Sequence, residues 1–187
     1  ALAGSGTTFA AEGLTINGTG ASGNGALRNV AGNNTWTGTV ALGTTGTNGI
    51  GVDASTSLTV SGVVSGVAGN NLTKLGGGTL SLTGTNTYSG STSVLAGTVA
   101  IAADSGLGTA PASATAGHLT LDGGTLQNTS SFTLNANRGV ALGAAGGTFN
   151  TNTGTTLTYN GIAAGTGSLD KTGAGTLLLG GANTYSG

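Results

Sequence analysis

The sequence predicts an all-β fold: a single-stranded, right-handed parallel β-helix of about eight coils, each of roughly 19–28 residues. Three observations support this prediction. Short stretches alternate apolar and hydroxyl side chains, which is the pattern of strands with one buried face. Pairs such as Gly-Gly, Asn-Gly and Asp-Gly separate these stretches and supply corners. A Gly-Thr-apolar unit also returns at intervals of one coil length.

The alternating stretches are too short to fold as independent hairpins. Thr79–Thr83 places Leu80 and Leu82 on one face and three hydroxyls on the other. Strands of this length bury little as isolated hairpins, whereas stacked coils pair each strand with its neighbours along the axis. We therefore expect coils. The same pattern occurs at Leu14–Ile16, Leu58–Val60, Leu119–Leu121, Phe132–Leu134 and Leu157–Tyr159.

The Gly-Thr-apolar unit sets the coil length. Its successive intervals are 40, 19, 27, 23 and 28 residues, and the first equals about two periods. Helix is not expected: the Ala-rich stretch Ala100–Gly117 contains glycines and Pro111, so it is predicted as an irregular excursion that returns Leu107 to the core. The unit begins at Gly38, Gly78, Gly97, Gly124, Gly147 and Gly175.

The composition excludes several classes of protein. Of 187 residues, 40 are Gly and 35 are Thr, while charged residues make up only 5%. The net charge of −1 and ordinary hydrophobicity argue against disorder. With no Cys there are no disulfides or thiolate metal sites, and no run of about 18 apolar residues could span a membrane as a helix. Nucleic acid is an unsuitable partner because the basic residues never cluster; they are Arg28, Lys74, Arg138 and Lys171.

A longer repeat lies above the coil period. Leu72–Gly90 aligns without gaps to Leu169–Gly187, with 13 of 19 positions identical and an offset of 97 residues. A degenerate copy, Asn33–Gly38, matches Thr85–Gly90, with Trp36 in the position of Tyr88. We expect residues 1–187 to form one continuous solenoid segment that contains these copies.

Two blocks of the repeat resemble a known family. Gly76–Gly90 and Gly173–Gly187 resemble the passenger-associated transport repeat of bacterial autotransporters, and Gly25–Gly38 is similar to sequences common in their passengers. The transport-type repeats would then occupy 72–99 and 169–187, with the degenerate copy near 25–40. The resemblance implies a β-helical passenger exported through an outer-membrane β-barrel and displayed at the cell surface or secreted. In that family the repeat is thought to assist export and folding.

The chain departs from a whole autotransporter in two respects. It contains no translocator barrel and no signal peptide, and it ends inside a repeat whose earlier copy continues to Val99. We therefore expect the natural protein to extend beyond both ends.

The residues capable of chemistry are few and scattered. His118 is the only histidine, so a Ser-His-Asp relay would depend on it, with Asp122 or Asp104 beside it. A β-helix glycosidase or lyase needs carboxylates that converge on one face. We expect no catalytic, cofactor or metal site, because five acids are spread over the coils: Glu12, Asp53, Asp104, Asp122 and Asp170.

The favoured function is a non-catalytic structural or adhesive passenger segment, a stalk or fibre. Its partners would be a glycan or protein on host or neighbouring cells, or further copies of itself. One alternative is a polysaccharide-processing β-helix enzyme. Another is a glycan- or ice-binding solenoid, in which Trp36, Tyr88 and Tyr185 would stack on sugars if exposed, or the threonines of Thr151–Thr158 would order water. The irregular coil length argues against an ice lattice.

Overall fold

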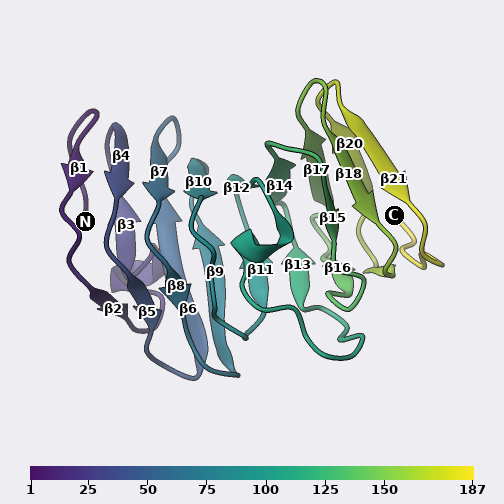
Figure 1. The fold of residues 1–187 in the computed structure, drawn as a ribbon, viewed down its shortest axis with the longest axis horizontal. Helices are drawn as coiled ribbons and strands as arrows, with labels where there is room; N and C mark the ends of the chain where they lie inside the picture. Colours follow the sequence, from purple (N-terminus) through teal and green to yellow (C-terminus); the bar gives the residue numbers. More distant parts are fainter.

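The computed structural model describes residues 1–187 and is a parallel β-solenoid of about seven turns, close to the eight expected. The coils follow one another along the long axis of the molecule, from the purple N-terminal end to the yellow C-terminal end (Figure 1). All pairings between strands are parallel, as the fold prediction requires. The predicted parallel β-solenoid is confirmed.

Each coil passes over three faces. Face 1 is an eight-stranded sheet that runs the length of the solenoid. Its strands are, in order, β1 (Thr8–Phe9), β4 (Asn33–Trp36), β7 (Ser57–Val60), β10 (Thr79–Leu82), β12 (Thr98–Ile101), β14 (Thr125–Asn128), β17 (Gly147–Thr151) and β20 (Leu169–Thr172).

Face 2 is a seven-stranded sheet, and face 3 is divided into two three-stranded sheets. Face 2 contains β3 (Leu27–Asn29), β6 (Gly46–Val52), β9 (Asn70–Leu75), β11 (Thr92–Val94), β13 (Leu119–Leu121), β16 (Val140–Leu142) and β19 (Ala163–Gly165). Face 3 contains β2 (Leu14–Ile16), β5 (Val40–Leu42) and β8 (Val64–Ser65), then β15 (Phe132–Leu134), β18 (Thr156–Tyr159) and β21 (Thr176–Leu179).

The core consists of apolar columns that run along the axis. On face 1, Leu58, Leu80, Val99, Leu126 and Phe149 lie in register, and all are fully buried. They belong to one cluster of 28 buried apolar residues. Burial of each such side chain contributes about 1.5–3 kcal/mol, so this continuous column supplies much of the driving force for stacking.

Face 3 is interrupted where two coils lack a strand, and residues 83–91 and 102–118 fill the gap. The second segment contains the short 3-10 helix η2 (Asp104–Leu107), and Leu107 is buried, as predicted. The excursion starts slightly later than predicted because Thr98–Ile101 forms β12. A second 3-10 helix, η1 (Ala21–Gly23), lies in the first coils. Neither helix has the length and apolarity needed to cross a membrane.

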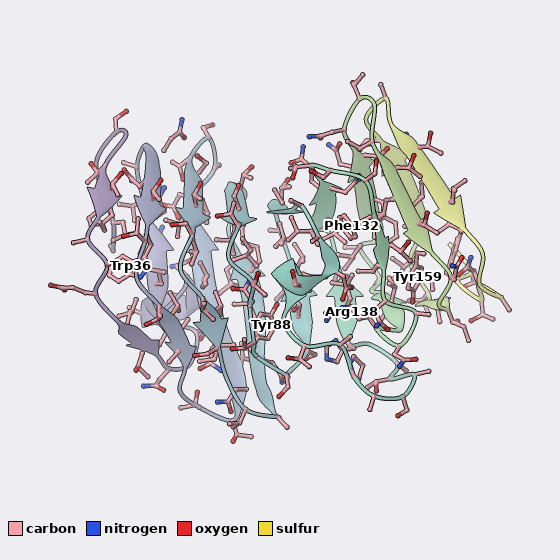
Figure 2. The ribbon with its side chains drawn as sticks, viewed as in Figure 1. Trp36, Tyr88, Phe132, Arg138 and Tyr159 are labelled. Atoms are coloured by element: carbon pink, nitrogen blue, oxygen red, sulfur yellow. The ribbon has the colours of Figure 1, made fainter.

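A buried arginine holds the excursion in place. The Arg138 guanidinium is fully buried (Figure 2), and its Nε lies 2.8 Å from Asp104 Oδ1. The same side chain donates to the backbone carbonyls of Leu107 and Gly108 at 2.9 and 2.6 Å. The ion pair therefore joins η2 to the coil that follows it, and the excursion covers what would otherwise be an open side of the core.

Candidate functional site

No hydrogen bond joins the groups considered for catalysis. His118 is 6% exposed, and neither of its ring nitrogens has a hydrogen-bond partner, while burial lowers its pKa. Asp122 Oδ1 accepts a bond from the Ala145 N–H, and Asp104 pairs with Arg138. These three residues of the hypothetical relay thus have separate local roles and form no proton-transfer chain.

The remaining acids are also separate. Asp53 accepts two bonds from Arg28, at 2.8 and 2.7 Å, and these bonds lower the pKa of the Asp53 carboxyl. Glu12 and Asp170 are exposed. No three His, Asp or Glu side chains lie close enough together to hold a metal ion. Two of the five acids are therefore held by arginines, and the other three make no ion pair.

The largest hollow is an apolar groove of about 480 Å³ beside the excursion. It crosses three successive coils at the corner before face 2 and is lined mainly by alanine, glycine, Val140 and Ile162. Neither His118 nor any acidic residue lines this groove. The lining therefore offers no titratable side chain to the groove.

The three repeat aromatics all pack against the core. Tyr88 is fully buried, and its hydroxyl lies 2.7 Å from Thr92 Oγ1. Trp36 is half-buried and stacks on Phe9, with ring centroids 6.1 Å apart, and Tyr185 is half-buried against the core cluster. The sequence left the exposure of these aromatics open. In the structure Tyr88 (labelled in Figure 2) is fully buried and offers no ring face to a sugar, whereas Trp36 and Tyr185 are only half-buried.

Face 1 carries a column of outward threonines in register: Thr79, Thr98, Thr125 and Thr148. The unequal coil lengths do not disturb this column, because the extra residues lie in loops. Irregular coil length therefore does not by itself exclude a regular array of hydroxyl groups. The neighbouring outward column contains Ala100 and Gln127 instead of a second threonine rank. The surface is therefore a mixed polar face and not a regular hydroxyl lattice.

The repeat contains a hydrogen-bonded clamp between coils. Asn86 Oδ1 accepts a bond of 2.8 Å from the Val64 N–H of the preceding coil. The carbonyl of Val64 in turn accepts from the N–H of Thr87 at 2.9 Å. Asn86 Nδ2 donates to the Gly106 carbonyl of the following coil at 2.8 Å. One buried amide thus connects three successive coils.

The other two copies repeat the backward part of this clamp. Asn34 Oδ1 accepts from the Thr7 N–H at 3.1 Å, and Thr35 N–H donates to the Thr7 carbonyl at 2.9 Å. Asn183 Oδ1 accepts from the Ala163 N–H at 2.8 Å, and the next residue donates to the Ala163 carbonyl at 2.9 Å. In each copy the asparagine side chain therefore replaces a main-chain acceptor at the point where the chain joins the ladder.

The glycine that ends each block lies against the backbone of the preceding coil. A Cβ at Gly90 would overlap the carbonyl oxygen of Asn70, and one at Gly38 would overlap that of Glu12. Gly187 lies equally close to Gly167. We call residues 34–38, 86–90 and 183–187 the clamp cassettes: each has an asparagine acceptor, an aromatic plug two residues on, and a closely packed glycine.

The cassettes lie on three different faces. Residues 34–38 begin in β4 of face 1, residues 86–90 bond to β8 of face 3, and residues 183–187 bond to β19 of face 2. The strands before them shift in the same way: Leu72–Leu75 lies on face 2, whereas Leu169–Thr172 lies on face 1. The 97-residue offset is therefore four coils and one further face.

Both full repeats also place a lysine at the corner before their second strand. Lys74 is fully buried in the inward column between Ile50 and Val94. Its Nζ donates to the carbonyls of Leu75, Gly76 and Ala96 at 2.9, 2.6 and 3.3 Å. Burial lowers the pKa of Lys74 to about 8. Lys171 makes the corresponding bond to Gly173 at 2.7 Å but is exposed.

Fold and cassettes together define a parallel β-solenoid built partly from a repeated inter-coil clamp. The sequence model of the passenger-associated-transport-repeat family matches residues 72–101 and 169–187. The chain is also 47% identical, over 111 residues, to the protein named adhesin BmaC autotransporter of Brucella suis biovar 1 (strain 1330). That alignment covers 59% of this chain and 3% of the length of the relative. No solved structure matches significantly.

These findings confirm the resemblance to an autotransporter passenger that the sequence indicated. Passengers of this kind are exported, so the matches indicate a location outside the cell, on the bacterial surface or released from it. The repeat blocks are evident in the sequence, but the role of their asparagines is not, because an Asn-Thr pair in a Thr-rich chain is also typical of an ordinary turn.

Proposed function

We propose that this chain is a structural, adhesive segment of an exported bacterial surface protein and that it has no catalytic activity of its own. The observation that carries the proposal is the 47% identity over 111 residues to an autotransporter adhesin. Continuous buried columns and a weakly charged polar surface suit a rigid stalk. The partner would be a glycan or protein on a host or neighbouring cell, or a second copy of the chain.

Adhesion can be tested with the purified chain coupled to fluorescent beads. We expect these beads to be retained on epithelial or bacterial cells more than beads that carry the same chain after thermal unfolding. Treatment of the cells with protease or with glycosidases would then identify the class of partner. Equal retention of folded and unfolded coatings, together with a monomeric chain in sedimentation, would contradict the adhesive role.

The non-catalytic part has its own test. The chain is incubated with uronate-containing and neutral polysaccharides, and new reducing ends are measured. We expect none above the rate of a boiled sample, because the acids lie apart and pair locally. Release of reducing ends that is lost in Asp104→Asn or Asp122→Asn would instead favour the enzyme.

A further inference from the structure

The alternation of apolar and polar residues specifies the register of this solenoid only to within two residues. A shift by one residue turns every inward side chain outward, which the core forbids. A shift by two residues keeps every side chain on its own side of the sheet. If β12 moved two residues along β10, Val99 would lie over Leu82 instead of Leu80, and Thr98 over Ser81 instead of Thr79. Apolar residues would still stack inside and hydroxyls outside.

The clamp cassettes remove this ambiguity. In the native register the Asn86 amide bonds to the Val64 N–H on one side and to the Gly106 carbonyl on the other, and a two-residue shift would have to break both bonds of this buried amide. The glycine adds a steric condition, because only a residue without Cβ fits where Gly90 meets the Asn70 backbone. A shift would bring Tyr88 or Thr92 to that position.

The cassette works on whichever face it occurs. The bonds of Asn34, Asn86 and Asn183 to the preceding coil are the same on faces 1, 3 and 2, although the local strands differ in sequence. We propose that the Asn-Thr-aromatic-Ser/Thr-Gly cassette is a portable register lock, which sets how each new coil is laid on the coil before it. The lock is needed here because short Thr/Leu strands on either side carry no such information.

Disulfide trapping can test the register lock directly, since the chain has no cysteine of its own. The pair Thr79→Cys/Thr98→Cys joins half-buried residues that are opposite in the native register. The pair Ser81→Cys/Thr98→Cys joins residues that are opposite only after a two-residue shift. Each pair is refolded from denaturant with and without Asn86→Ala and is then oxidised. The matched control is Asn150→Ala, an asparagine on face 1 without side-chain hydrogen bonds to its neighbours.

With Asn86 present, we expect the native pair to cross-link and the shifted pair to remain at background. Asn86→Ala should raise the ratio of shifted to native cross-linking about tenfold or more, as the loss of buried hydrogen bonds implies, and Asn150→Ala should not. Purely native cross-linking in refolded Asn86→Ala would overturn the proposal.

If Asn86→Ala does not fold, the last coil gives an independent test. Asn183→Ala leaves the preceding coils intact, and Thr184 N–H bonded to Ala163 places Thr184 opposite Ala164. The native pair is then Ala164→Cys/Thr184→Cys, and the shifted pair is Ala164→Cys/Ser186→Cys. A shifted product in Asn183→Ala supports the lock, and its absence contradicts it.

Discussion

Lys74 gives the solenoid a characteristic dependence of stability on pH. Its ammonium lies in an apolar column and is fully buried, with only three backbone carbonyls as partners. Burial lowers its pKa from 10.5 to about 8. In the unfolded chain the same amine titrates near its ordinary value, so between these two pKa values the unfolded state binds a proton that the folded state has released. The free energy of unfolding must therefore rise with pH in this window.

The size of the rise follows from the two pKa values. At 1.36 kcal/mol per pKa unit, the full difference between the two pKa values can raise the free energy of unfolding by at most about 3 kcal/mol. Between about pH 7.5 and pH 9.5 the linkage relation gives a rise of about 2 kcal/mol. Above pH 10 the trend should reverse, because burial raises the pKa of Tyr88 to about 12 and the unfolded tyrosine ionises first.

The assay is urea unfolding followed by circular dichroism at several pH values within this range. Lys74→Met should abolish the rise, because methionine fills the column without a titrating group. Lys171→Met is the matched control: it changes the corresponding, exposed lysine of the second repeat and should leave the pH profile unchanged. A free energy of unfolding that is flat or falls from pH 7.5 to 9.5 in the unmodified chain would show that Lys74 does not titrate with a lowered pKa in the folded state.

Four further substitutions test the packing. Phe149→Ala should lower the free energy of unfolding by about 3–5 kcal/mol, whereas Thr148→Ala beside it should change the value by less than about 0.5 kcal/mol; equal effects in urea titrations would contradict the assigned faces. Arg138→Ala should cost about 3–5 kcal/mol and speed amide exchange in residues 102–118 first, so unchanged exchange there would exclude the proposed anchoring. Gly90→Ala should lower the melting temperature, with a cost of about 1–3 kcal/mol, because its methyl would meet the Asn70 carbonyl; an unchanged melting temperature would show that this contact is loose.

Much of the local structure could be predicted from the sequence. Thr79–Leu82, Leu119–Leu121 and Phe132–Leu134 are strands where the alternation placed them, and Leu107 returns to the core from an irregular segment. These predictions succeed because the period of two and the corner residues act within a few positions of the chain.

The bonding partners of the catalytic candidates could not be predicted from the sequence. The sequence placed Asp122 four residues after His118 and left Asp104 as a third member, but the fold assigns Asp104 to Arg138 across 34 residues. It likewise pairs Asp53 with Arg28 of the preceding coil. Such pairings depend on how many residues each loop inserts between coils, and residue spacing alone does not reveal this.

Local periodicity and motif identity alone predict that the chain winds into coils, that the leucines and valines of each alternating stretch face inward, and where the two transport repeats lie. The face that each repeat occupies, and the coil to which each asparagine, lysine and arginine bonds, become visible only in the folded molecule. A two-residue alternation fixes inside and outside but not the position along the neighbouring strand. That position is set by side-chain bonds between coils, and these exist only when the coils are stacked.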